Sequence, residues 1–213
     1  MAKTIQKHVK RDAVSTQEKI KAAAHKVFLS KGYAAATTRD VAEEAGINLA
    51  LVNYYFRSKK NLFEMVMQEK IQFLLGTIFP IISDASSSLD QKIEGIANAY
   101  IDFLTKNPDL PTFILNELRK NDFDFISKTG IDQVLKKSPF IQQLKGESRN
   151  INPVHFLISL LAMTIFPFVA RPILMKTGLV DESSFQKLMN ERRTLIPAWI
   201  KAMRSMTYKP IAV

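Results

Sequence analysis

Apolar residues recur at helical spacing along most of the chain, and the first such stretch follows Ser15. Residues 15–18 fit a capping box, in which the first and fourth side chains bond each other's backbone N–H groups. The apolar positions that follow are three or four residues apart: Ile20, Ala23, Ala24, Val27 and Phe28. Gly32 then supplies a C-terminal stop signal. This pattern predicts a helix from about Ser15 to Gly32.

Two much shorter helices are predicted next. Residues 37–40 carry a start signal, and Gly46 ends the apolar pattern after about two turns. Asn48 is a suitable N-cap for a further helix, whose pattern runs to Phe56. The spacing therefore predicts two short helices joined by a turn that contains Gly46.

The remaining residues continue in the same helical pattern. A polar stretch over residues 83–88 is the best loop in the middle of the chain, and residues 138–150 are also expected to form a loop. A kink is expected near Pro167 and Pro172. The pattern predicts further helices over residues 59–80, 89–106, 111–118, 123–137, 152–176 and 181–206.

Composition supports an all-α fold of about nine helices. The chain has 213 residues, of which 46% are hydrophobic, and this is enough to bury a core. Only seven glycines and no run of short alternating strands argue against a sandwich, a barrel or a glycine-loop nucleotide fold. The absence of cysteine excludes a disulfide scaffold, an iron–sulfur cluster, a cysteine zinc site and a thiol nucleophile.

Positive charge is concentrated near the N-terminus. The whole chain has a formal net charge of +10, and residues 1–60 hold twelve Lys or Arg against five Asp or Glu. Such a surplus favours a nucleic acid or an anionic membrane as partner. Because the basic residues 1–14 lack helical periodicity, they are expected to form a flexible arm.

Two short helices around a glycine turn, inside the basic part of the chain, describe a helix-turn-helix that binds DNA. A helical hairpin that merely packs is the alternative from the same pattern. On the second helix, 100° per residue directs Val52 and Phe56 to the core, whereas Ala50, Asn53 and Tyr54 point outward. That outer face suits a major groove, since asparagine pairs with adenine edges and tyrosine bonds phosphates.

Phosphate contacts are expected from the starts of two helices. Thr38 and Arg39 begin the helix before the turn, and Lys59 begins the helix after Phe56. Free backbone N–H groups and the helix dipole favour phosphate at such positions. These contacts would position the DNA without reading its sequence.

Residues 37–47 (TTRDVAEEAGI) and 52–63 (VNYYFRSKKNLF) together resemble the DNA-binding domain of the TetR family of bacterial transcriptional regulators. The family's pattern has a glycine after an alanine-rich helix, an aromatic pair, a phenylalanine and a Ser-Lys pair in this order. The resemblance covers about Ser15 to Phe63. Leu51 stands where a small residue is common and Asn53 where tyrosine is common, so the operator sequence does not follow from the resemblance.

The resemblance implies a domain order and a mode of action. Residues 1–14 would be the basic flexible arm, 15–60 the helix-turn-helix DNA-binding domain, and 61–213 a helical ligand-binding and dimerisation domain. The protein would be a homodimer joined by its last two helices, and a repressor released from a palindromic operator by a small apolar or amphipathic effector. The positions implied to contact DNA are Thr38, Arg39, Asn48, Leu49, Ala50, Asn53, Tyr54, Tyr55 and Lys59.

The C-terminal part offers no sign of catalysis, cofactor or metal. The three histidines, His8, His25 and His155, form no triad or zinc spacing, so the chain is not expected to be an enzyme. In the family the middle helices surround a ligand cavity. Here the cavity would draw on Tyr100, Phe103, Phe113, Met163 and Phe166, although aromatic and methionine residues at helical spacing more often form a core.

One segment has the composition of a membrane span. Residues 150–170 carry no charged side chain, but they include polar residues together with Pro153 and Pro167. A helix buried in a core or a subunit interface is therefore favoured over a span. With no signal-peptide pattern at the N-terminus, a cytoplasmic protein associated with the nucleoid is expected.

Two rival functions remain open from the sequence. One is an all-helical enzyme or a carrier of apolar molecules, for which convergent polar groups would be needed. The other is a DNA-binding protein without an effector. An apolar pocket of several hundred Å³ would favour a sensor, and a filled core would favour the protein without an effector.

Overall fold

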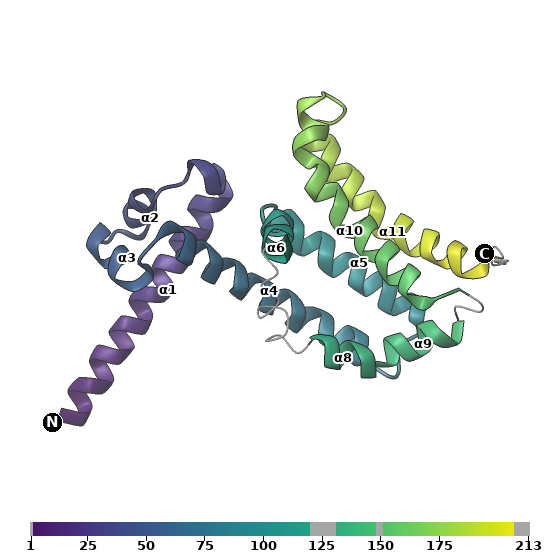
Figure 1. Ribbon diagram of the computed structural model, residues 1–213, viewed down its shortest axis with the longest axis horizontal. Coiled ribbons are helices and arrows are strands. Elements are labelled where there is room, and N and C mark those ends of the chain that lie inside the picture. Colours follow the sequence, from purple (N-terminus) through teal and green to yellow (C-terminus); the bar gives the residue numbers. More distant parts are fainter. Residues whose placement is uncertain (1, 120–130, 148–150, 207–213) are drawn as a thin grey trace. The chain divides into compact units, whose positions relative to one another are not determined.

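The computed structural model describes residues 2–119, 131–147 and 151–206, and within these ranges it contains ten α-helices and no strand (Figure 1). The helices are α1 Ala2–Ala35, α2 Thr38–Ala45, α3 Leu49–Phe56, α4 Lys59–Ser83, α5 Leu89–Lys106, α6 Leu110–Arg119, α8 Ile131–Lys137, α9 Pro139–Glu147, α10 Pro153–Lys176 and α11 Glu182–Ser205. The all-α class predicted from the sequence is confirmed.

The N-terminal helix is longer than the sequence pattern predicts. A flexible arm over residues 1–14 and a helix start at Ser15 are expected, whereas α1 begins at Ala2. No glycine or proline lies between Ala2 and Lys31, and alanine, lysine, glutamine and arginine favour the helix. Nothing therefore interrupts the helix before the capping sequence, which starts a helix only where the preceding backbone is not helical.

The glycine stop in α1 acts as predicted. Gly32 has φ 71° and ψ 162°, which interrupts the helical backbone three residues before Ala35. This conformation is accessible essentially to glycine alone. The regular part of α1 therefore ends at the residue that the sequence indicates.

Several other helix limits follow their capping residues. Ser88 caps α5 in a capping box with Gln91, and the Asn152 side chain accepts from the backbone N–H of Val154 at the start of α10. Asp181 accepts from the N–H of Ser184 at the start of α11. Short-range hydrogen bonds decide these limits, so the sequence predicts them well.

The expected loop over residues 138–150 is wrong for most of its length, because α9 occupies Pro139–Glu147. The Ser138 hydroxyl accepts from the backbone N–H of Ile141 at 3.3 Å, and proline suits the first position of a helix. Of the helix predicted over 123–137, residues 131–137 form α8, and residues 123–130 lie outside the described residues.

The chain divides into two compact units, Met1–Ile71 and Gln72–Val213. In the first unit, α1 packs on α2 and α2 packs on α3. The apolar stripe predicted for α1 is buried throughout, and so is the short stripe of α2, which consists of Val41, Ala42 and Ala45. The rings of Phe28, Tyr33 and Phe63 form an aromatic cluster, with Phe28 and Phe63 edge to face at 5.0 Å.

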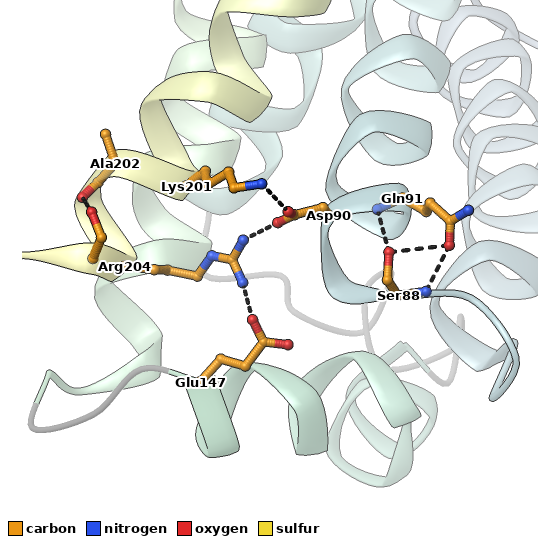
Figure 2. A network of polar contacts seen from close by, with 8 residues as sticks. Ser88, Asp90, Gln91, Glu147, Lys201, Ala202 and Arg204 are labelled. Carbon is orange, nitrogen blue, oxygen red and sulfur yellow. Dashed lines mark hydrogen bonds and ion pairs between the residues drawn. The ribbon is translucent and has the colours of Figure 1, made fainter.

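In the second unit, α5 packs against α9, α10 and α11. Figure 2 shows Arg204 of α11 bonded to Asp90 of α5 and to Glu147 of α9, while Lys201 lies 2.9 Å from Asp90. Burial by itself would raise the pKa of Asp90, but Lys201 and Arg204 together hold that pKa below its usual value. The network therefore joins three helices through one largely buried guanidinium.

Two helices, α4 and α10, are long and apolar enough to cross a membrane by length and composition alone. Only one such segment, residues 150–170, is expected from the sequence, so α4 corrects that expectation. Its buried positions recur from Leu62 to Ile82, which is typical of a core helix that passes the same test. In α10 a buried row, Phe156, Leu160, Thr164 and Phe168, is accompanied by exposed apolar residues on other faces.

Candidate nucleic-acid interface and apolar cavity

The first helix of the predicted helix-turn-helix is fixed by a complete capping box. The Thr37 hydroxyl accepts from the backbone N–H of Asp40 at 3.1 Å, and the Asp40 carboxylate accepts from the backbone N–H of Thr37 at 2.8 Å. Lys31 lies 2.9 Å from the other oxygen of Asp40. Hydrogen bonds from Lys31 and Thr37 lower the pKa of Asp40 to about 2. The start of α2 is thus held by an ionised carboxylate.

The turn between α2 and α3 has the geometry that its residues predict. Gly46 is left-handed, with φ 63° and ψ 39°, and the N–H of Ile47 donates to the Ala42 carbonyl at 3.0 Å. Glycine adopts this conformation without steric cost. The Asn48 side chain then accepts from the N–H of Ala50 at 2.8 Å and starts α3.

The two faces of α3 are those predicted from the sequence. Val52 and Phe56 are buried, whereas Ala50, Asn53 and Tyr54 are exposed. Tyr54 is the most exposed large apolar residue of the described chain, with 77% of its surface accessible. Two buried anchors, one turn apart, therefore hold α3 in place and leave a free outer face.

Other predicted DNA-contacting residues flank that face. Leu49 and Tyr55 are half-buried, so each is turned partly toward the core. The rings of Tyr54 and Tyr55 lie edge to face at 5.2 Å, so each limits the rotation of the other. Asn48 is exposed and its side-chain oxygen serves as the cap.

The basic side chains near α2 and α3 are either paired with a carboxylate or exposed. Lys26 pairs with Glu44 at 3.1 Å and Lys31 pairs with Asp40, so neither ammonium is free. Arg39 and Arg57 are exposed, and no ion pair is found for either within the part of the chain that the structure describes. Thr38 is half-buried at the first position of α2. Arg39 is thus available to an anion, as its predicted role requires.

Lys59 has partners that the sequence does not predict. Its ammonium donates to the carbonyl oxygens of Tyr33 at 2.9 Å, Ala36 at 3.0 Å and Ala34 at 3.4 Å. It also lies 4.5 Å from the centre of the Tyr33 ring. A lysine that bonds the terminal carbonyls of a helix stabilises that helix end. The side chain therefore ties the start of α4 to the end of α1, a role different from the expected phosphate contact.

Arg57 is a candidate that the sequence analysis misses. It ends α3 with φ 61° and ψ −37°, and it is the one residue other than glycine with positive φ among the described residues. Such a backbone is strained for a side chain with a Cβ and is typical of functional positions. Its exposed guanidinium follows directly after the outer face of α3. Neither charge count nor periodicity singles it out.

The comparison with known proteins agrees with the helix-turn-helix geometry of α2 and α3. The profile of the family described as bacterial regulatory proteins, tetR family, matches residues 20–66, which include α2, α3 and the buried stripe of α1. The chain is 25% identical over 206 residues to the Probable HTH-type transcriptional regulator YttP of Bacillus subtilis, with 89% of this chain and 94% of the relative covered.

Residues 20–66 therefore form a DNA-binding domain of the TetR family.

One further relative and two solved structures are also similar to this chain. The HTH-type transcriptional repressor KstR2 of Mycolicibacterium smegmatis is 29% identical over 110 residues, which cover 45% of this chain and about half, 53%, of the relative. A TetR-family regulatory protein from Rhodococcus RHA1 has the same fold, with a TM-score of 0.60, 17% identity, and 87% and 96% of the two chains covered. The fatty acid degradation regulator FadR from Bacillus halodurans superposes with a TM-score of 0.53 and 18% identity, with 84% and 93% covered.

With a TetR-type DNA-binding domain and relatives that are regulators, the chain is assigned as a transcriptional regulator. Regulators of the family bind operator DNA, form dimers and work in the cytoplasm. Its named relatives are regulators and not enzymes. Among the described residues no group of three or more His, Cys, Asp or Glu could hold a metal ion.

The second unit contains an apolar cavity of about 110 Å³. Five helices contribute to its wall, which is lined by Ile78, Ile82, Ile96, Tyr100, Ile131, Leu135, Phe140, Leu157, Leu160 and Leu161. Phe140 is not predicted from the sequence, because a loop is expected where α9 lies. An apolar pair at Phe140 and Ile141, directly after a helix start at Pro139, is the signal that could have found it.

Of the residues predicted to bind a ligand, Tyr100 lines this cavity. Phe103 is buried elsewhere and stacks on Phe73 at 6.0 Å. Met163 is half-buried in α10, and Phe166 is 64% exposed. The side chain of Phe113 lies outside the described residues. Sequence periodicity identifies apolar positions, but it does not tell a cavity wall from a packed core or an outer face.

Proposed function

We propose that this protein represses transcription from a palindromic operator and is released by a small apolar or amphipathic ligand. The observation that carries the proposal is the outer face of α3, where Ala50, Asn53 and Tyr54 are exposed above two buried anchors. A helix of this kind enters the major groove, while the preceding helix crosses the phosphate backbone. Base contacts come from Ala50, Asn53 and Tyr54. The positioning contacts come from Thr38, Arg39, Asn48, Leu49 and Tyr55.

The operator is best identified by selection. The purified full chain is mixed with random genomic fragments, and the fragments that it retains at 150 mM salt are sequenced. We expect an inverted repeat whose half-sites lie a whole number of helical turns apart, about 34–36 Å or a multiple of this. Retention of fragments with no shared sequence would contradict a specific operator.

The proposal includes a homodimer formed by α10 and α11, which lie side by side in Figure 1. Both helices carry exposed apolar residues: Val154, Ile158, Leu161, Phe166 and Ile173 on α10, and Leu188, Leu195 and Trp199 on α11. Exposed apolar surface of this extent marks an interaction site, and two such helices from each copy make a four-helix interface. We expect it to bury about 2,000 Å² or more in total.

Light scattering at micromolar concentration tests the dimer. A homodimer is expected for the unmodified protein, and Trp199→Arg should give a monomer or an aggregate, because an unpaired charge in an interface costs several kcal/mol. Leu29→Arg is the matched control, since Leu29 is also an exposed apolar residue but lies in the first unit. A monomeric unmodified protein would contradict the proposal.

Ligand release is the second part of the proposal. A ligand between the helices of the second unit changes the distance between the two DNA-reading helices, and a shift of a few ångströms breaks the fit to one half-site. By linkage, the ligand binds the free protein more tightly than the DNA-bound protein, by the factor that it weakens the operator. An unchanged operator affinity at saturating ligand would contradict this mechanism.

A DNA-binding protein without an effector is the second candidate function. The cavity of about 110 Å³ favours it in part, because drug-sized ligands occupy about 300–1,000 Å³. We further propose that the protein has no enzymatic activity, no cofactor and no membrane partner, and that it acts in the cytoplasm on the nucleoid. Its presence in the supernatant of a lysate without detergent is the expected result for its location.

A further inference from the structure

Among the described residues, no charged side chain lines the cavity of the second unit. Nine of the ten lining residues are Ile, Leu or Phe, and the tenth is Tyr100. An ionised group that enters such a space loses its hydration and meets no opposite charge, which is strongly unfavourable. The wall therefore selects against carboxylates and ammonium groups.

Tyr100 supplies the one polar atom of the lining side chains. Burial raises the pKa of Tyr100 to about 12, so its hydroxyl stays protonated at neutral pH. No hydrogen bond to this hydroxyl is found within the described ranges. A protonated phenol both donates and accepts, and it can serve a ligand with one hydroxyl or carbonyl oxygen.

The volume limits the size of the occupant. An engineered protein cavity of about 150 Å³ lined by apolar residues stays dry and binds benzene. The present cavity of about 110 Å³ therefore has room for about one six-membered ring or a short branched chain. A long acyl chain does not fit without displacement of the wall.

A fully buried charged residue, Lys92, lies on the same helix as part of the wall, one helical turn before Ile96 on α5. It is fully buried, but its ammonium donates to the Ser87 carbonyl at 2.5 Å and to the Ser87 hydroxyl at 2.9 Å. These bonds hold the ammonium toward the loop before α5. Lys92 is thus engaged in the fold and is not part of the cavity wall.

We propose that the effector is a small neutral molecule of about seven non-hydrogen atoms, apolar except for one oxygen that bonds the Tyr100 hydroxyl. This inference rests on the proposed function, in which the second unit senses a ligand. It narrows that function from any apolar or amphipathic ligand to an uncharged one, and it makes Tyr100 the residue that determines specificity.

Three probes of equal size test the charge selection. Phenol, toluene and pentanoate each have seven non-hydrogen atoms, and only pentanoate is ionised at pH 7. Calorimetric titration of the full-length protein without DNA should show binding of phenol and toluene, and pentanoate binding at least 10-fold weaker. Equal or tighter binding of pentanoate would overturn the proposal, and so would the absence of binding by all three probes.

Two variants test the residues. Tyr100→Phe should weaken phenol roughly 3- to 10-fold, the value of one lost hydrogen bond, and leave toluene unchanged. Tyr33→Phe is the matched control, because Tyr33 lies in the first unit, and it should change neither affinity. Equal changes for phenol and toluene in Tyr100→Phe would overturn the role of the hydroxyl. Leu157→Phe, which fills the cavity, should weaken both probes.

A carboxylate site that recruits Lys92 is the rival result. In that case Lys92→Met would abolish pentanoate binding, and phenol would not compete for the site. Because these titrations contain no DNA, their outcome is separate from that of the operator selection. A chain that binds phenol but retains no specific DNA would refute the proposed function and leave the ligand assignment standing.

Discussion

Arg192 of α11 donates two hydrogen bonds to the main-chain carbonyl of Met163 in α10, from Nε at 3.2 Å and from Nη2 at 3.0 Å. Met163 lies four residues before Pro167, and proline has no N–H with which to bond that carbonyl inside the helix. The guanidinium supplies the missing donor and also lies 5.3 Å from the centre of the Trp199 ring. A proline in one helix thus explains an arginine in the next.

We predict that Arg192→Met lowers the free energy of unfolding by about 1–3 kcal/mol, because it leaves the Met163 carbonyl without a donor. In a protein that already carries Pro167→Ala, Arg192→Met should lower the free energy of unfolding by less than half as much, because the restored N–H of residue 167 can bond the Met163 carbonyl. Urea unfolding of the four proteins at one protein concentration measures the difference. Equal costs in both backgrounds would show that Arg192 does not compensate for the proline.

Asn53 is predicted to read a base. Its side chain lies on the exposed face of α3 and can make a bidentate pair with an adenine edge. Asn53→Ala should cost about 1–3 kcal/mol of binding on the selected operator and little on a scrambled duplex. Equal losses on both duplexes, measured by fluorescence anisotropy, would refute this role.

Lys59 is predicted to stabilise the first unit. Lys59→Met removes the ammonium from the carbonyls of Tyr33 and Ala34 in α1 and of Ala36 just after it, and should lower the free energy of unfolding by about 1–3 kcal/mol. Any weaker binding of DNA should follow from this loss of stability. The slope of log binding constant against log salt concentration, the salt slope, should be unchanged when binding is measured well below the unfolding temperature.

Arg39 is the matched comparison for Lys59. It is exposed at the start of α2 and should contact phosphate, so Arg39→Ala should reduce the salt slope by about one unit per subunit and leave stability within about 0.5 kcal/mol. Salt titrations of both variants decide between the roles. A reduced salt slope for Lys59→Met, with unchanged stability, would instead indicate that Lys59 contacts a phosphate.

Asp40 is predicted to make the first unit sensitive to acid. Hydrogen bonds from Lys31 and Thr37 lower its pKa from 3.8 to about 2, so the folded state favours the ionised carboxylate. A lowered pKa stabilises the fold above pH 4, and this contribution is lost as the pH falls from about 4 to about 2. Asp40→Asn should therefore unfold at lower urea concentration at pH 7, and its midpoint should change less between pH 4 and pH 2. A parallel pH dependence for both proteins would contradict this.

The helices and their caps follow from short-range information. Ile20, Val27 and Phe28 recur at the helical period and are all buried, and Gly46 and Asn48 end and start helices through bonds to residues two to five positions away. The same period predicts the outer face of α3, and the resemblance of residues 37–63 to one family adds the expected DNA contacts. The start of α9 has a signal of the same kind, the Ser138 cap followed by Pro139, but the sequence pattern over residues 138–150 is interpreted as a loop.

The sequence by itself determined which positions are apolar, where most helices begin and end, and that the basic quarter of the chain holds a helix-turn-helix. Only the tertiary structure decided what each side chain meets. Lys59 bonds carbonyls about 25 residues earlier in the chain, and Tyr100 lines a cavity while Phe103, three residues later, stacks on Phe73. Arg192 reaches a carbonyl 29 residues away. Local periodicity is set by the backbone of a single helix, whereas these partners depend on how separate helices pack, and no local pattern contains that information.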